Sequence, residues 1–144
     1  ASANVPLALQ LSYADSLLAI GNSEKAGELL SLLPPADAVL LRRAIASKHR
    51  NGPDLAGLRA QLEARFRAAD TLAVDELHWR ERALYALDVQ EEPARALQFA
   101  IRNWTEQKGW EDAALLLRAA AAAGDPGAGT VVDRWREAQA GETS

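Results

Sequence analysis

Short groups of helix-breaking residues recur along this chain and divide it into segments of similar length. The breaks lie at Gly21-Asn22, Pro34-Pro35, Asn51-Gly52-Pro53, Asp70-Thr71, residues 90–93, Lys108-Gly109 and Gly124-Asp125-Pro126. The segments between them consist mainly of Ala, Leu, Arg and Glu, which favour helices, whereas Val, Ile and Thr are sparse and do not alternate as in strands. The sequence therefore predicts an all-α fold without a sheet. Its helices are expected near residues 5–20, 23–33, 36–50, 53–69, 73–88, 92–107, 110–123 and 127–140.

The apolar residues of the longer segments follow helical periodicity. They lie three or four residues apart at Leu55, Leu58, Leu62 and Phe66 in the fourth segment, and at Leu97, Ile101 and Trp104 in the sixth. Residues at these spacings share one face of a helix. Charged residues occupy the other faces, so each of these helices is expected to bury one apolar stripe.

The links between the segments are only a few residues long, and short links make neighbouring helices antiparallel. Consecutive pairing gives four hairpins near residues 1–34, 35–70, 71–107 and 108–144, a period of about 36 residues. A regular period in this range is typical of stacked helical hairpins. We therefore expect one helical-repeat domain over residues 1–144.

Two stretches of the chain carry the residues of a known repeat. One contains Tyr13, Ala14, Leu17, Gly21, Ala26, Leu30 and Pro34, and the other contains Leu97, Ala100, Ile101, Trp104, residues 109–113, Leu117 and Pro126. Both resemble the tetratricopeptide repeat (TPR) family, in which a helix with large residues precedes a helix with a small residue and a closing proline. The resemblance implies a right-handed α-α superhelix, a solenoid of about eight antiparallel helices. The two stretches fit different repeat phases, and we favour the phase that leaves no helix unpaired.

The tryptophans receive structural interpretations. Alanine at helix crossings allows two helix axes to approach closely, and Trp104 and Trp110 are expected to fill the space where the helices diverge. Trp79 and Trp135 lie among charged residues, so we expect them to be partly exposed.

Composition and charge exclude several classes of function. The formal net charge is −4 and the arginines are scattered among acids, so no basic patch is expected to bind nucleic acid. The absence of cysteine excludes disulfides, thiolate nucleophiles and cysteine-ligated zinc. No apolar run approaches the roughly 20 residues that span a bilayer, so we expect a soluble protein, cytoplasmic or exported to a periplasm, without a membrane partner. Because methionine is also absent, we expect the chain to be a processed or excised part of a longer protein.

No set of residues in the sequence indicates a particular chemical reaction. His49 lies at the end of an expected helix, as a surface capping residue does, and His78 has only Asp75 and Glu81 near it on its helix face, too few ligands for a metal. The glycine-containing loops lack the phosphate-binding spacings, and there is no GxSxG motif. We therefore expect no catalytic, metal-binding or cofactor-binding residues and no enzymatic activity.

The TPR resemblance implies a scaffold that binds a protein or a peptide on its concave face. In the favoured phase, the first helix of each hairpin lines this face. Its outward positions are Leu11, Asp15, Leu18, Leu41, Ile45, Lys48, His78, Glu81, Tyr85, Asp88 and Arg118. We predict that the partner contacts the polar and aromatic members of this set, which are His78, Glu81, Tyr85, Asp88, Lys48 and Arg118. A solvated helix surface is the alternative interpretation of these positions.

A structural or dimerisation role is the alternative function. In that case, apolar residues at the two ends of the chain pack against the rest of a longer protein or against a second copy in a homodimer. These residues are Val5, Leu7, Leu9, Val131, Val132 and Trp135. A clamp for C-terminal carboxylates, which some TPR domains build from lysine and asparagine, is not predicted, because the asparagines lack partner lysines at helical spacing.

Overall fold

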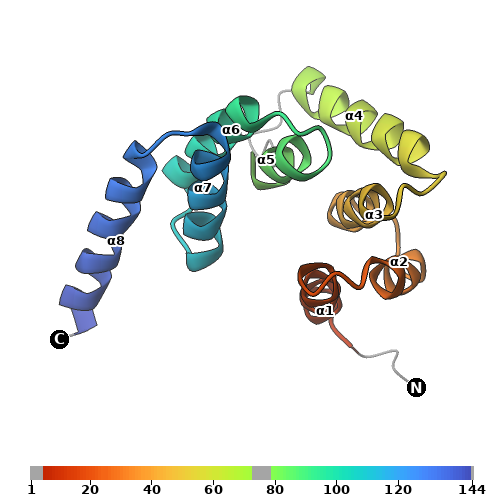
Figure 1. The fold of residues 1–144 in the computed structure, drawn as a ribbon, viewed down its shortest axis with the longest axis horizontal. Coiled ribbons are helices and arrows are strands. Elements are labelled where there is room, and N and C mark those ends of the chain that lie inside the picture. The colour runs from red at the N-terminus through yellow and green to blue at the C-terminus, as the bar shows by residue number, and fades with distance from the viewer. Residues whose placement is uncertain (1–4, 73–78, 144) are drawn as a thin grey trace. The chain divides into compact units, whose positions relative to one another are not determined.

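The computed structural model describes residues 5–72 and 79–143, and in these ranges it contains helices and no strands (Figure 1). The helices are α1 (Leu7–Ala19), α2 (Ser23–Ser31), α3 (Asp37–Arg50), α4 (Leu55–Thr71), α5 (Trp79–Asp88), α6 (Pro93–Glu106), α7 (Trp110–Ala123) and α8 (Gly127–Thr143). The prediction of an all-α chain is confirmed for these ranges. Each helix overlaps its expected segment, and the predicted start of the fifth helix, at residue 73, lies outside the described residues.

Local features at the sequence breaks explain where several helices begin and end. The Oδ1 atom of Asn22 caps α2 by accepting a hydrogen bond from the backbone N–H of Lys25 at 3.3 Å. α6 begins with Pro93, whose fixed φ suits the first turn of a helix. α3 and α7 end before Asn51 and Gly124, which adopt the left-handed conformation at φ 53° and 73°. The breaks in the sequence therefore act as helix caps.

The helices group into two compact units. Unit 1 comprises Ala1–Leu77 and contains α1 to α4, and unit 2 comprises His78–Ser144 and contains α5 to α8. Within each unit consecutive helices pack against each other, and the first helix also contacts the third. The organisation of residues 1–144 as one domain and as a superhelix stays a prediction.

The core of unit 1 is built around α3. This helix contacts α1, α2 and α4, so its Leu40 and Leu41 are fully buried. Ala14 from α1, Leu30 from α2 and Val39 from α3 form one apolar cluster. The third helix thus holds the first hairpin against the second within this unit.

Small side chains dominate the core of unit 2. The buried alanines of α5, α6 and α7 are Ala83, Ala86, Ala96, Ala100, Ala113, Ala119 and Ala120. Small residues at a helix contact allow the two backbones to approach closely. The structure therefore has alanine at the contacts of these helices, as the sequence predicts.

The two predicted apolar stripes differ in outcome. The stripe of α4 is confirmed, because its members are buried or half-buried: Leu55, Leu58, Leu62 and Phe66. The stripe of α6 is correct for Leu97 and Trp104, but Ile101 is 47% exposed. The buried face of α6 includes Ala96 and Ala100 instead, because α5 and α7 contact the helix there, and Ile101 lies beside this face.

The tryptophans of unit 2 have different environments. Trp104 is buried with 6% exposure, whereas Trp110 is 63% exposed, so the prediction that both fill the space between helices is wrong for Trp110. Trp110 is the first residue of α7, and the ring of Trp135, 4.8 Å away between centroids, covers only part of it. Trp135 also meets the edge of Trp104 at 5.4 Å. Trp79 and Trp135 are half-buried, which confirms that both are partly exposed.

Two glycine substitutions should change stability in opposite directions. Gly124→Ala should lower the free energy of unfolding by about 1 kcal/mol, because alanine is strained in the left-handed conformation that this residue adopts at φ 73°. Gly57→Ala, inside α4, should raise it by about 0.5–1 kcal/mol, since an added Cβ meets nothing within 4 Å. Urea unfolding followed by circular dichroism measures both changes. A change in the free energy of unfolding that has the same sign in both variants would contradict the described conformation of one of the two glycines.

Candidate functional site

The predicted binding residues are distributed over both units. Lys48 is half-buried in the last turn of α3, and Glu81 is half-buried in the first turn of α5. The structure brings Asp88 of α5 and Arg118 of α7 together, with Arg118 Nη2 2.6 Å from Asp88 Oδ1. His78 lies outside the described residues.

The expected exposure of Tyr85 is wrong. Its side chain is 3% exposed, and two further positions expected to point outward, Leu41 and Ile45, are 0% and 8% exposed. The physical reason is that these helices have neighbours on several sides, because α3 contacts α1, α2 and α4, and α5 contacts α6 and α7. Apolar and aromatic side chains of such helices are therefore covered. Tyr85 packs inside unit 2 rather than standing ready as an exposed anchor.

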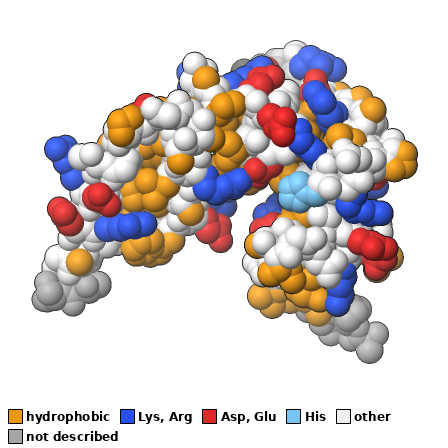
Figure 2. All heavy atoms as spheres, in the orientation of Figure 1, with side chains coloured by type: hydrophobic (Ala, Val, Ile, Leu, Met, Phe, Trp, Pro, Cys, Tyr) orange, Lys and Arg blue, Asp and Glu red, His pale blue; other side chains and the backbone are white. Residues whose placement is uncertain are grey.

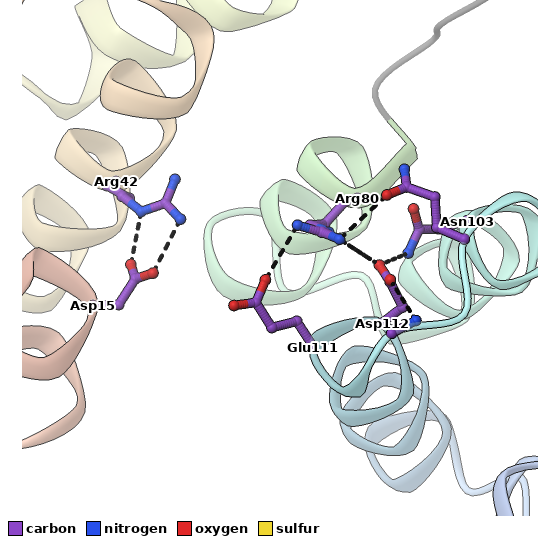
Figure 3. Close-up of polar contacts among 8 residues, drawn as sticks. Asp15, Arg42, Arg80, Asn103, Glu111 and Asp112 are labelled. Atoms are coloured by element: carbon purple, nitrogen blue, oxygen red, sulfur yellow. Dashed lines mark hydrogen bonds and ion pairs between the residues drawn. The ribbon is translucent and has the colours of Figure 1, made fainter. Parts of the chain in front are cut away.

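In both units an arginine of the third helix pairs with an aspartate of the first helix. In unit 1, Arg42 of α3 donates from Nε and Nη2 to the two carboxylate oxygens of Asp15 in α1, at 2.7 and 3.0 Å (Figure 3). In unit 2, Arg118 of α7 and Asp88 of α5 form the equivalent pair. Asp15 and Arg118 are 52% and 53% exposed, so both pairs lie at the surface. We call the surface around each pair the bridged face of its unit.

A buried carboxylate in unit 2 joins three helices. Asp112, in the first turn of α7, accepts hydrogen bonds at Oδ1 from Arg80 of α5, at 3.1 Å from Nε and 2.7 Å from Nη2 (Figure 3). The same oxygen accepts from Asn103 Nδ2 of α6 at 2.7 Å. Its Oδ2 accepts from the backbone N–H of Gly109 at 3.0 Å. Arg80 also donates from Nη1 to Glu111 at 3.3 Å, so the guanidinium lies between two acids.

The pKa of Asp112 is set by opposing influences. Burial is the largest and disfavours the charged form, which by itself raises the pKa. The hydrogen bonds from Asn103, Arg80 and Gly109, together with the charge of Arg80, outweigh burial and bring the pKa below its ordinary value of 3.8. Asp112 therefore stays ionised at neutral pH. Since both carboxylate oxygens already accept hydrogen bonds from the protein, we interpret it as a structural residue.

This network was not predicted, although two features that indicate it are present. Asp112 lies three residues after Gly109, the position from which an acidic side chain caps the start of a helix. Asn103 lies on the buried face of α6 with 1% exposure, and a buried amide requires a hydrogen-bonding partner. Arg80 gives no such local signal, because it lies 32 residues from Asp112 in the chain.

Unit 1 contains a cavity of about 270 Å³ beside α3. Arg43, Ser47 and Arg50 line it from one face of α3, since they are spaced four and three residues apart. The remaining lining comes from α2 and from the loop after α3, where Asp54 Oδ1 accepts a hydrogen bond from Ser47 Oγ at 2.6 Å. Within residues 5–72 and 79–143, no acid forms an ion pair with Arg43 or Arg50. These two arginines were not among the predicted binding residues.

The described part of the chain, residues 5–72 and 79–143, offers no metal site and no membrane-spanning segment. It contains no group of three or more histidine or acidic side chains placed to hold a metal ion. Nor is any helix in these ranges both long and apolar enough to pass through a bilayer.

No family model, curated protein or solved structure matches this chain. The geometry of the described residues is therefore the basis on which a function is proposed.

Loss of the Asp112 charge should destabilise the protein in a pH-dependent way. Asp112→Asn should lower the free energy of unfolding by about 2 kcal/mol at pH 7, because a buried, hydrogen-bonded ion pair is broken. The pKa of Asp112 is lower in the folded protein, so its stabilising contribution is present above the ordinary pKa of 3.8 and is lost as pH falls through the folded-state pKa. Urea unfolding of both proteins at pH 7 and at acidic pH measures this difference.

The matched control for this experiment is Asp88→Asn, which breaks the ion pair with Arg118. That pair is more exposed, so its loss should cost less than about 1 kcal/mol at pH 7. A difference between wild type and Asp112→Asn that does not shrink in acid would contradict the assigned pKa direction.

Proposed function

We propose that this chain is a scaffold of TPR-like helical hairpins that binds a protein or a peptide on the bridged faces, and that it is not an enzyme. The observation that carries the proposal is the contact between the first and third helices of each unit, α1 with α3 and α5 with α7. Among the described residues, α2 with α4 and α6 with α8 make no comparable contact. Alternate helices therefore approach each other on one side of each unit only.

One-sided contact of this kind supports a curved stack. When the first helices of successive hairpins are closer together than the second helices, the stack bends toward the first helices. This arrangement supports the repeat phase in which α1, α3, α5 and α7 are first helices. It also supports a concave side on each unit by itself, which carries the Asp15–Arg42 pair in unit 1 and the Asp88–Arg118 pair in unit 2.

The chemistry of the bridged faces suits a polar or charged partner. Each pair combines an exposed member with a more buried one, with exposures of 52% and 18% for Asp15 and Arg42, and of 53% and 21% for Arg118 and Asp88. The pairs hold the side chains in place before a partner arrives, so binding costs little side-chain entropy on the protein side. A partner with its own charged groups can hydrogen-bond to the exposed members. In this role Glu81 and Lys48 are additional polar contacts, and His78 stays a predicted one.

Exposed apolar side chains favour a second candidate, a structural or dimerisation role. Leu7, Leu9 and Val131 are 41%, 62% and 46% exposed, and Val5 is 43% exposed. Figure 2 shows hydrophobic side chains gathered over α1 and, separately, over α7 and α8 on the face in view. Val132 is fully buried and therefore belongs to the core of unit 2, which corrects its assignment to an interface.

Light scattering of the intact chain separates the two candidates. A dimer that persists on dilution and dissociates in Leu9→Glu or Val131→Glu would support the second candidate. A monomer that binds peptides would support the first.

Charge reversal on the bridged faces should abolish most peptide binding. Peptides selected from a random library on the intact chain should bind the Arg42→Glu, Arg118→Glu double variant at least about 10-fold more weakly, because both charge-paired sites are inverted. Fluorescence anisotropy measures the dissociation constants. Circular dichroism of the double variant must first show that it is folded, so that weaker binding can be attributed to the changed charges.

The matched control reverses two arginines on second helices. Arg59→Glu, Arg95→Glu changes the same charge on α4 and α6, at side chains that are 44% and 59% exposed. It should alter binding less than about 2-fold. A larger loss in this control than in the bridged-face variant would show that the partner binds elsewhere.

A further inference from the structure

We propose that the cavity beside α3 in unit 1 binds an oxyanion, the carboxylate or phosphate group of a small ligand, between Arg43 and Arg50. The cavity is lined by α2, α3 and the loop after α3, whereas the bridged face of unit 1 lies where α3 meets α1. The site is therefore additional to the proposed partner-binding surface.

Positive charge beside the cavity is not balanced by ion pairs in the part of the chain that the structure describes. Three of the four other arginines of unit 1 have acidic partners, since Arg42 pairs with Asp15, Arg59 with Glu63 and Arg65 with Asp37. The fourth, Arg67, is exposed on α4 and lines no part of this cavity. Arg43 and Arg50 line one cavity together, and no acid of the described ranges pairs with either. Two guanidinium groups beside one cavity repel each other, and an oxyanion between them relieves this repulsion. Guanidinium presents a planar fork of donors that matches carboxylate and phosphate oxygens.

The complete lining of the cavity carries a net positive charge. Asp54 is the acidic residue of the cavity wall, and its Oδ1 already accepts the hydrogen bond from Ser47 at 2.6 Å. Ser47 is itself only 5% exposed, which fixes this pair in the wall. Two arginines and one aspartate leave one net positive charge, so the cavity favours an anion.

The walls of the cavity limit the size of the ligand. A Cβ added to Gly27 of α2 would lie 3.4 Å from Arg50 Nη1, so the guanidinium lies against the backbone of α2. A Cβ added to Gly52 would lie 2.6 Å from Ser47 Oγ, so only glycine allows the loop to close on α3 here. The resulting volume, about 270 Å³, is below the roughly 300 Å³ at which drug-sized ligand sites begin. The cavity therefore suits a small anion.

Nuclear magnetic resonance titration of the intact chain tests this site. Sodium phosphate and sodium succinate are added in separate titrations, with ionic strength held constant by sodium chloride. We expect saturable shifts of the Nε–H signals of Arg43 and Arg50 and of the Gly52 amide. The probe that saturates at lower concentration identifies phosphate or carboxylate as the favoured group. If neither probe gives saturable shifts, the proposal is wrong.

Three variants distinguish the cavity from general attraction to positive charge. Arg43→Gln, Arg50→Gln should weaken binding at least about 10-fold, because both charge-assisted contacts are lost. Gly27→Leu keeps both arginines but fills the cavity from α2, and it should weaken binding to a similar extent. Arg67→Gln removes an exposed arginine of α4 and should leave binding within about 2-fold. Unchanged binding in Gly27→Leu, or an equal loss in Arg67→Gln, would overturn the proposal.

Discussion

Burial of apolar faces between neighbouring helices is the constraint on which both units depend. α2 and α5 span only nine and 10 described residues, and isolated helices shorter than about 12–15 residues are marginal in water. α2 and α5 are stable because neighbouring helices cover them. The helix with the most neighbours in unit 1 is α3. With α1, α2 and α4 packed against it, α3 buries Leu40 and Leu41 completely. Such a helix has little surface left for function, and its exposed residues are His49 and Arg50.

The two units meet this constraint with different side chains. Leucine is the most frequent buried apolar residue of unit 1, whereas alanine is the most frequent in the core of unit 2, in α5, α6 and α7. Alanine brings helices close but buries little apolar area, and it specifies their relative register poorly. The Asp112 carboxylate fixes the register of these helices, because Arg80 and Asn103 must both hydrogen-bond to the same oxygen. A fully satisfied buried polar network of this kind specifies one arrangement of its helices.

The positions of the helices could be predicted from the sequence because their ends depend on local residues. Asn22, Pro93 and Gly124 stop or start a helix through their own backbone and side-chain chemistry. Exposure is different, because it depends on which helix covers a residue from elsewhere in the chain. Periodicity correctly indicated a buried face on α6, yet it could not show that α5 and α7 would cover Ala100 and leave Ile101 outside. Tyr85 was misjudged for the same reason.

The candidate sites were predictable only where both partners could be recognised separately. Asp88 and Arg118 were each expected on the concave face, and the structure shows that they meet. Arg43 and Arg50 lie seven residues apart on α3, a spacing visible in the sequence. They stand out because both line one cavity and neither forms an ion pair with an acid of the described ranges, which depends on the packing of α2 and of the loop after α3.

The arginines of α3 connect the two proposed surfaces of unit 1. Arg42 and Arg43 are adjacent in sequence, and consecutive residues of a helix point about 100° apart. Arg42 therefore reaches α1 and pairs with Asp15, while Arg43 reaches the cavity on another side of the same helix. An anion held by Arg43 and Arg50 leaves the Arg42–Asp15 pair in place, so a small ligand and a peptide partner can occupy unit 1 together. Because both would contact one buried helix, the ligand would also stabilise the element that presents the bridged face.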